Sequence, residues 1–209
     1  MRITHFGHSC LLVDTGSARL LFDPGGYSSG FEVVEELDAV LVTHQHPDHL
    51  DPERLPALLA ANPGARLVLD HGSAEPHEDL GPLVARPGDV LELAGATVHV
   101  LAADHAPIHP AVPVPPNVGY LVDHGAFYHP GDSLAVPEQR INVLGLPAAG
   151  PWMKVSEGAD FLAAVGPRVA IPIHEAVLAV PELHYRVLAG TAPEGVEFRV
   201  LPRGESIEL

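Results

Sequence analysis

Between residues 38 and 49 the chain reads Asp38-Ala39-Val40-Leu41-Val42-Thr43-His44-Gln45-His46-Pro47-Asp48-His49. The apolar run over residues 38–43 is typical of a strand that is buried on both faces. Four residues of metal-ligand type follow it within six positions. In an extended segment residues two apart point to the same side, so His44 and His46 can bind one ion. A tight turn after Pro47 directs Asp48 and His49 to a neighbouring point. The stretch therefore predicts two adjacent metal positions at the C-terminal end of a strand.

The six residues from His44 to His49 resemble the His-x-His-x-Asp-His signature of the metallo-β-lactamase superfamily. The resemblance extends over nearly the whole chain, and it is closest to the small single-domain metal-dependent hydrolases related to the ascorbate-6-phosphate lactonase group. It rests on four further segments: Thr4 to Cys10, Leu21-Phe22-Asp23-Pro24, Tyr128-His129-Pro130-Gly131-Asp132 and Ile171-Pro172-Ile173-His174. The fold class that it implies is α/β (α+β), a four-layer αββα metallo-β-lactamase sandwich formed by one domain over residues 1–209.

The same resemblance implies a set of metal ligands. His44, His46 and a third histidine would hold the first ion. The second ion would be held by Asp48, His49 and His174, and Asp132 would be shared between the two ions.

Two residues compete for the place of the third histidine. His105 follows the expected strand Thr97 to Leu101, as a ligand delivered by a strand end should, whereas His109 lies four residues further on in a proline-rich loop. We favour His105. His99 lies inside the strand and is interpreted as structural.

Imidazole and carboxylate ligands together suit zinc, and they are also compatible with manganese or iron. Two divalent ions roughly 3.5–4 Å apart can share a hydroxide and lower the pKa of the bound water toward 7. Asp48 would orient that hydroxide or accept its proton. His8 is a second candidate for a catalytic role or a substrate contact, or else it is only a histidine hydrogen-bonded in a turn. We therefore expect a metal-dependent hydrolase that uses a di-metal-bound hydroxide to cleave an ester, lactone or phosphodiester bond of a small molecule.

Two other functions stay open at this point. One is a mononuclear-iron dioxygenase that acts on persulfides. The other is a non-catalytic metal-binding protein, in which no coordination position is free for a substrate.

Four residues outside the ligand set are candidates for supporting the ligands or contacting the substrate. Asp23 would orient a ligand histidine, or else serve only as a turn residue before Pro24. His129 would hold a ligand through its second ring nitrogen, or pack inside a strand. Trp152 would form an apolar wall of the pocket or pack under a loop. Lys154 would reach a phosphate, if the substrate carries one.

The composition excludes several classes of protein. The 27 acidic and 11 basic residues give a formal net charge of −16, which disfavours binding to a nucleic-acid backbone. Cys10 is the single cysteine, so no intrachain disulfide forms. No signal peptide and no apolar run of membrane-spanning length is visible, so we expect a cytoplasmic protein that contacts no membrane. The sequence leaves the oligomeric state open, and a homo-oligomer is compatible with it.

The remaining elements are predicted from apolar periodicity and turn residues. We expect a helix that starts at Pro52, with Asp51 as its N-cap, and a second helix capped by Ser156-Glu157. A third helix is expected over residues 181–188 and a late strand over residues 196–201. The stretch from Ala106 to Pro116 is expected to be a functional loop rather than a linker.

Overall fold

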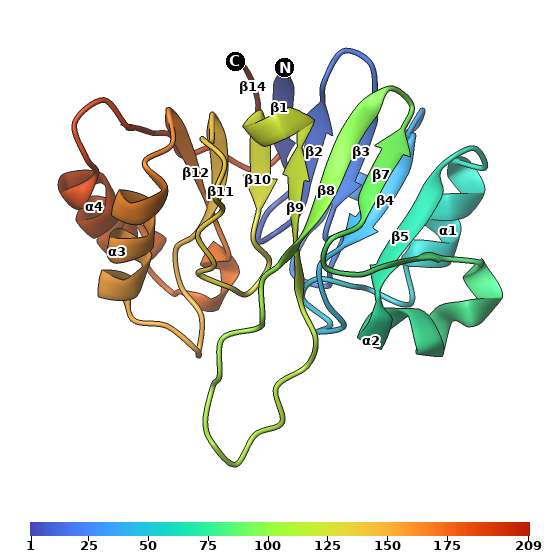
Figure 1. Cartoon of the computed structure of the whole chain (residues 1–209), viewed down its shortest axis with the longest axis horizontal. Coiled ribbons are helices and arrows are strands. Elements are labelled where there is room, and N and C mark those ends of the chain that lie inside the picture. The colour runs from blue at the N-terminus through green and yellow to red at the C-terminus, as the bar shows by residue number, and fades with distance from the viewer.

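Two seven-stranded sheets face each other in the computed structural model, which describes residues 1–209 (Figure 1). The strands of the first sheet are, in spatial order, β14 (Ser206–Glu208), β1 (Arg2–His5), β2 (Leu11–Asp14), β3 (Arg19–Phe22), β4 (Ala39–Val42), β5 (Arg66–Asp70) and β6 (Leu83–Ala85). Those of the second sheet are β13 (Glu197–Phe198), β12 (Val169–Ile173), β11 (Val143–Pro147), β10 (Phe127–His129), β9 (Val118–Val122), β8 (Ala96–Ala102) and β7 (Val90–Leu93). In each sheet, antiparallel pairs at one end give way to parallel pairs at the other.

Helices cover the outer face of each sheet, which completes the expected four-layer αββα sandwich (Figure 1). They are α1 (Leu55–Ala61) and α2 (His71–Ala74) on the first sheet, and α3 (Val155–Val165) and α4 (Pro181–Thr191) on the second. Short 3₁₀ turns are η1 (Phe31–Val33), η2 (Glu75–Leu80), η3 (Asp123–Gly125) and η4 (Glu175–Val177). None of these helices has the length and apolarity needed to cross a bilayer.

Strand β4 shows why its sequence is apolar at every position. Ala39 and Leu41 point into the core between the two sheets, whereas Val40 and Val42 pack under α1. Because side chains alternate across a strand, a strand covered on both faces needs apolar residues on both. This packing holds the end of β4 rigidly, and the motif that begins at His44 follows directly from it.

The helix predicted to start at Pro52 starts instead at Leu55. The carboxylate of Asp51 accepts the backbone N–H groups of Glu53 and Arg54, and its second oxygen pairs with the Arg54 guanidinium at 2.6 Å. These bonds stabilise a separate turn over residues 52–54, so the predicted N-cap begins that turn, and the helix follows it. Helix α3 likewise starts at Val155, with Lys154 rather than Ser156 as the N-cap, and Glu157 accepts the Lys154 backbone N–H.

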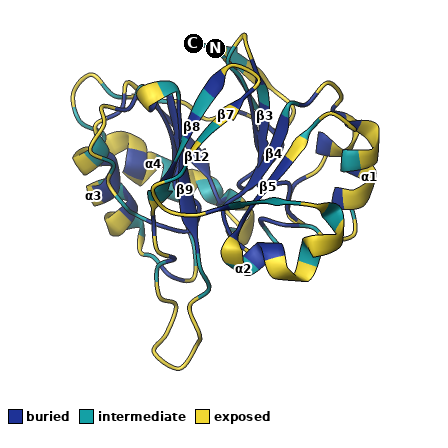
Figure 2. Cartoon of the chain, turned by 45° about the vertical axis from the view of Figure 1, so that its right-hand side comes forward, coloured by how far each residue is buried: buried dark blue, intermediate teal, exposed yellow.

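The last part of the chain differs from the expected single strand over residues 196–201. Only Glu197 and Phe198 pair, in β13, and a further strand, β14, returns to pair with β1. The expected loop lies between β8 and β9, and residues 107–114 of it are exposed (Figure 2). It projects from the lower edge of the sandwich in Figure 1, away from the two chain ends.

Candidate metal centre

Four side chains meet at the end of β4 in a group that we call the first cluster: His44, His46, His105 and Asp132. Their ligand atoms all lie within 4.8 Å of one another. His46 Nδ1 lies 3.0 Å from His44 Nε2 and 3.3 Å from His105 Nε2. His105, favoured over His109 from the sequence, is thus the histidine that the fold places here. His109 is exposed and its Nδ1 accepts the backbone N–H of Ala111.

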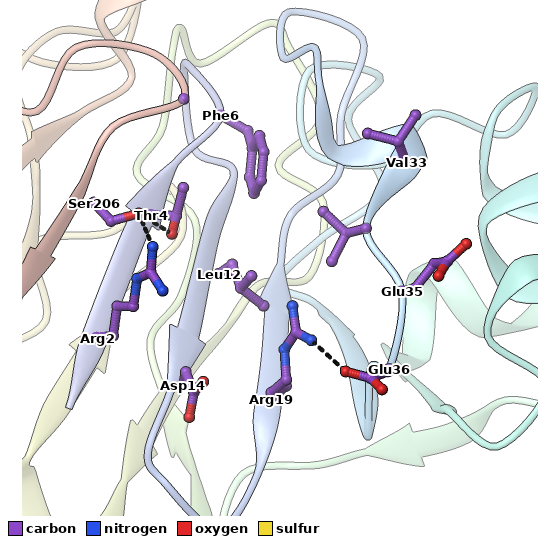
Figure 3. Close-up of a pocket in the computed structure, with 12 residues that line it drawn as sticks. Arg2, Thr4, Phe6, Leu12, Asp14, Arg19, Val33, Glu35, Glu36 and Ser206 are labelled. Carbon is purple, nitrogen blue, oxygen red and sulfur yellow. Dashed lines mark hydrogen bonds and ion pairs between the residues drawn. The ribbon is translucent and has the colours of Figure 1, made fainter.

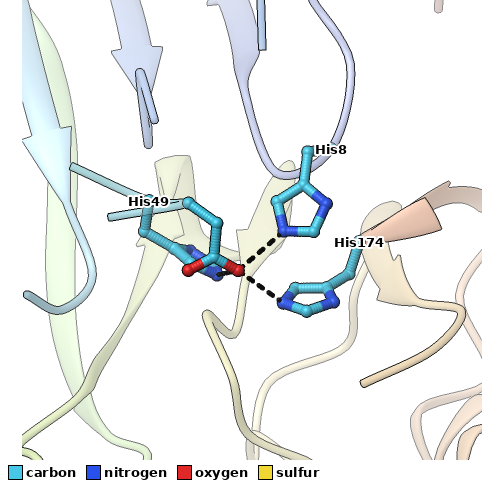
Figure 4. Close-up of side chains that lie close together, drawn as sticks. His8, His49 and His174 are labelled. Atoms are coloured by element: carbon cyan, nitrogen blue, oxygen red, sulfur yellow. Dashed lines mark hydrogen bonds and ion pairs between the residues drawn. The ribbon is translucent and has the colours of Figure 1, made fainter. Parts of the chain in front are cut away.

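A second cluster lies beside the first and contains His8, Asp48, His49 and His174 (Figure 4). Three of its imidazole nitrogens surround one carboxylate oxygen, Asp48 Oδ2. The distances are 3.0 Å to His8 Nε2, 3.5 Å to His174 Nε2 and 3.8 Å to His49 Nε2. The residues come from the β1–β2 turn, the β4 motif and the end of β12, so the fold gathers them from both sheets.

The carboxylate of Asp132 lies between the clusters. Its Oδ1 is 3.0 Å from His49 Nε2 and 3.1 Å from His174 Nε2, while its Oδ2 is 3.4 Å from His105 Nε2. One oxygen therefore faces each cluster, which is the arrangement that a bridging ligand needs.

The ring orientation of three histidines is fixed by a bond at the nitrogen remote from the cluster. Nδ1 of His49 donates to Asp23 at 2.7 Å, and Nδ1 of His105 donates to the Ala106 carbonyl at 2.7 Å. Nδ1 of His44 lies 3.1 Å from the Thr43 hydroxyl. When Nδ1 carries the proton, Nε2 presents its lone pair, so these bonds leave Nε2 free to bind a cation.

Several polar atoms at the centre are buried without any hydrogen-bond partner. They include Nε2 of His49, Nε2 of His174 and Oδ1 of Asp132, which form no hydrogen bond although the two nitrogens lie 3.0 and 3.1 Å from that oxygen. Burying such atoms without compensation is costly, and native proteins rarely leave them so. A cation between them would satisfy all three, so the residues present fit a metal site.

Charge is distributed unevenly between the clusters. Burial and the neighbouring imidazoles lower the pKa of His44 well below its usual value, and the pKa of His46 is lowered for the same reasons. For His49 burial acts in the same direction, but Asp132 and Asp23 outweigh it and raise the pKa well above the usual range. The pKa of His174 is also raised, against the effect of burial, by Asp132 and Asp48.

Asp23 accepts hydrogen bonds that hold the segment from Thr43 to His49 in place. Its Oδ1 accepts the Thr43 backbone N–H at 2.8 Å, and its Oδ2 accepts both the Thr43 hydroxyl at 2.8 Å and His49 Nδ1–H. Asp23 is completely buried. Of the two readings of Asp23, orientation of a ligand histidine is therefore the one that this geometry supports.

The loop after Asp23 also touches the motif through its backbone. A Cβ at Gly25 would overlap the backbone carbonyl of Asp48. Only glycine permits so close an approach, and Gly26 donates its N–H to the Pro47 carbonyl at 2.7 Å. The turn that carries Asp48 and His49 is thus held by contacts from the β3–β4 loop.

Trp152 contacts residues of the two clusters directly instead of only lining a pocket. Its indole N–H donates to Asp132 Oδ2 at 2.7 Å, and its ring packs edge-on against His105 and His174. Lys154 lies exposed at the start of α3, and no hydrogen bond or ion pair joins its ammonium group to either cluster. The structure therefore does not bring Lys154 to the site.

His129 forms hydrogen bonds with backbone groups, whereas we expected it to hold the side chain of a metal ligand. Its Nε2 bonds the Ser9 carbonyl at 2.9 Å, and its Nδ1 accepts the Gly131 N–H at 3.2 Å. With both ring nitrogens engaged, no nitrogen remains for a ligand. The bond to Gly131 fixes the turn that carries Asp132.

Glu175 is a site residue that the sequence reasoning missed. Its Oε1 accepts the His8 backbone N–H at 2.9 Å, and its Oε2 lies 3.7 Å from His5 Nε2. His5 in turn bonds the His8 carbonyl at 3.1 Å. The position of Glu175 directly after His174 was the only available signal, because its partners lie about 170 residues away in the sequence.

Three residues of the centre have the left-handed backbone conformation that favours glycine: His8 (φ 53°), Asp23 (φ 44°) and His174 (φ 65°). A non-glycine residue in this conformation costs of order 1–3 kcal/mol and persists only where its surroundings enforce it. At His8 the enforcing contacts are visible, since its N–H bonds Glu175 and its carbonyl accepts the His174 N–H at 3.1 Å.

A surface hollow lies elsewhere, on the outer face of β1, β2 and β3 (Figure 3). It encloses about 650 Å³ and contains two arginines. Arg19 lies 3.3 Å from Glu36, and Arg2 lies 3.9 Å from Glu208, so each already faces a carboxylate. No residue of either cluster lines this hollow, and we assign the functional site to the clusters.

Comparison with known proteins agrees with the fold and the motif. The chain belongs to the beta-lactamase superfamily domain family, whose model matches residues 2–174. It is 47% identical to the protein Rv0786c of Mycobacterium tuberculosis, over 99% of both chains. It is also 27% identical to a UPF0173 metal-dependent hydrolase of Aeropyrum pernix, over 100% of this chain and 97% of the relative. Among solved structures, the metallo hydrolase Igni18 of Ignicoccus hospitalis superposes with a TM-score of 0.74 at 23% identity, covering 99% of this chain and 97% of that one. The superposition supports the metallo-β-lactamase sandwich.

Proposed function

We propose that this protein is a metal-dependent hydrolase that binds two divalent cations, one at each cluster, and cleaves an ester, lactone or phosphodiester bond of a small molecule. The observation that carries the proposal is Asp132, whose two oxygens face the two clusters, while the neighbouring Nε2 atoms of His49 and His174 form no hydrogen bond. The relatives described as metal-dependent hydrolases support the same function. We also propose that residues 1–209 act as one domain, because the core between the sheets draws on strands from both halves of the chain.

The proposed ligands divide as the resemblance implies. His44, His46 and His105 would hold the first ion, Asp48, His49 and His174 would hold the second, and Asp132 would bridge them. Zinc suits this donor set best, and manganese or iron also fit it. When bound, the ions would supply an activated water molecule and positive charge for the leaving oxygen.

The residues of this chain would position and protect that chemistry. Asp48 is only partly buried, so its carboxylate can accept a proton at the entrance of the site. Its pKa is lowered by hydrogen bonds from His174 and His8 and by the charges of His49 and His174, which together outweigh burial, so it is ionised at neutral pH. Trp152 would hold Asp132 through its indole N–H and exclude water from that side.

The charges at the centre favour a substrate without a terminal phosphate. Every ion pair of the two clusters joins a carboxylate to an imidazole, and none involves lysine or arginine. A phosphate monoester is normally bound by such cations. We therefore rank a carboxylic ester or lactone above a sugar phosphate.

Metal content and turnover test the proposal together. The protein expressed in zinc- or manganese-supplemented medium should contain two ions per chain by plasma mass spectrometry and should hydrolyse a chromogenic ester, lactone or phosphodiester. His46→Ala should remove metal from the first position and abolish turnover, while the exposed, remote His124→Gln should behave as wild type. A protein that retains no metal contradicts the proposal. An iron spectrum with oxygen consumption on a persulfide would indicate the dioxygenase instead, and tight metal binding without turnover would indicate a non-catalytic protein.

A further inference from the structure

We propose that His8 is a direct metal ligand, the third imidazole of the second position, rather than a substrate contact or general catalyst. The inference rests on the proposed two-metal function. It goes beyond the ligand set that the His-x-His-x-Asp-His motif and its partner segments define, which provides only His49 and His174 as imidazoles at that position.

The first argument is convergence. In the absence of a cation, Asp48 Oδ2 lies among three imidazole Nε2 atoms, at 3.0 Å from His8, 3.5 Å from His174 and 3.8 Å from His49 (Figure 4). The shortest of these distances belongs to His8. If His8 served only to orient the carboxylate, no reason would exist for all three Nε2 atoms to face the same point. A cation held at about 2.0–2.1 Å from each nitrogen requires that they do.

The second argument is the likeness between the clusters. The first contains three imidazoles and one carboxylate, His44, His46, His105 and Asp132. With His8 included, the second has the same composition. The second position differs in that it also receives Asp132, through the oxygen opposite to the one that faces the first position.

The third argument is that the fold holds His8 in a backbone conformation that costs free energy. The residue is completely buried and has the left-handed backbone conformation. Glu175 accepts its N–H at 2.9 Å, while His5 Nε2 and the His174 N–H both bond its carbonyl at 3.1 Å. The centroid of its ring lies 4.0 Å from that of His174 and 5.2 Å from that of Tyr27. Such restraint is what a metal ligand needs, because its nitrogen must be placed within a few tenths of an ångström.

The assignment changes the coordination number expected at the second position. His8, His49, His174, Asp48 and the shared Asp132 would give five protein ligands, against four at the first. One solvent molecule would complete six. At this second position, six ligands suit manganese or iron better than zinc, whereas the four protein ligands of the first position still suit zinc.

Metal stoichiometry in His8→Gln tests the inference. Glutamine can still donate a hydrogen bond to Asp48 but lacks the imidazole. We expect the wild type to bind two ions and His8→Gln to bind one tightly, with the second weakened by more than the ~100-fold that loss of an outer partner causes. The matched control is His124→Gln, which changes an exposed histidine with the same backbone conformation (φ 54°). Two tightly bound ions in His8→Gln would overturn the inference while leaving the two-metal function intact; fewer than two in the wild type would overturn both.

A second measurement uses the wild type, so it does not depend on how well the variant folds. In the protein loaded with Co²⁺ at both positions, each imidazole bound to a metal should give one hyperfine-shifted ring N–H resonance. Six such resonances are expected if His8 is a ligand. Five resonances would show that His8 is not bound to a metal.

Discussion

The two clusters contain the same kinds of residue but differ in their balance of charge. Asp132 is the carboxylate of the first cluster, and the pKa values of His44 and His46 are lowered by burial and by neighbouring imidazoles. The second cluster has Asp48 inside it and Asp23 behind it, and these carboxylates together with Asp132 raise the pKa values of His49 and His174. At neutral pH the imidazoles of His44 and His46 are therefore uncharged and ready for a cation, whereas in the metal-free protein His49 and His174 carry protons.

Substitution of one imidazole in each cluster should have the largest effect and should separate the two positions. His44→Ala and His174→Ala should each reduce turnover by more than ~100-fold, since each removes a ligand rather than an outer partner. His44→Ala should retain the ion of the second position and His174→Ala that of the first. Plasma mass spectrometry with kinetics on the same preparations measures both effects. Equal loss of both ions in either variant would show that the positions fill only together.

The second-largest effect should come from changes of pH, which should alter the metal affinity of the two clusters differently. A cation can bind His49 and His174 only after their protons leave, so affinity at the second position should fall by up to ~100-fold per pH unit below their raised pKa values. The first position should change less over the same range, because the pKa values of His44 and His46 are lowered. Dialysis at pH 8, 7, 6 and 5, followed by metal analysis, should show a fall from two ions to one. Simultaneous loss of both ions would contradict the difference in charge.

The raised pKa values of His49 and His174 also predict how the stability of the metal-free protein changes with pH. A histidine whose pKa is raised on folding stabilises the fold fully below its unfolded value of about 6.5, and that contribution is lost as the pH rises through the folded pKa. Metal-free protein should therefore lose stability as the pH rises above about 6.5, and bound metal should remove this dependence. Denaturant unfolding with and without chelator tests the prediction. A metal-free protein that becomes more stable with rising pH would contradict it.

Asp23→Asn should produce an intermediate effect, mainly at the second position. The amide nitrogen of asparagine cannot accept the His49 Nδ1 proton, so that ring would lose its fixed orientation. Loss of such a partner typically costs 10–100-fold in metal affinity. Competition with a chromogenic chelator should show this loss for the second ion and a smaller one for the first, which Asp23 reaches through Thr43. An equal effect on both ions would mean that Asp23 supports the whole motif.

Trp152→Phe should give the smallest effect and should not discriminate between the clusters. It keeps the ring packing against His105 and His174 but removes the N–H bond to Asp132. A buried hydrogen bond to a charged group is worth ~1.5–3 kcal/mol. Because the ring packing is kept, we expect the lower end of that range, which corresponds to a fall in turnover of about tenfold. Unchanged kinetics would indicate that Asp132 is held by the ions alone.

The sequence predicted those parts of the site that depend on short segments. His44 to His49 follow a strand whose apolar pattern is unmistakable, and the segments that end at Asp132 and His174 each follow a strand in the same way. The helix start at Leu55 was mispredicted because the carboxylate of Asp51 stabilises a turn instead of capping the helix. Propensity alone cannot distinguish these two outcomes.

Contacts between segments far apart in the chain could not be predicted. Strand β14 has only three residues and forms because β1 offers a free edge. Glu175 reaches His8 across 167 positions, and the indole of Trp152 bonds Asp132 rather than simply lining a wall. Each of these contacts depends on how the two sheets pack, which no single segment encodes.

The left-handed backbone at His8, Asp23 and His174 has a consequence for how this protein can change under selection. Glycine would relieve the strain at each of the three positions, and it would also delete a side chain that the centre uses. Mutations selected for thermal tolerance alone would therefore be drawn toward the residues that activity needs most. Heat-adapted forms of this protein should gain their tolerance at a distance from the metal centre, for example at exposed loops, and keep these three strained residues unchanged.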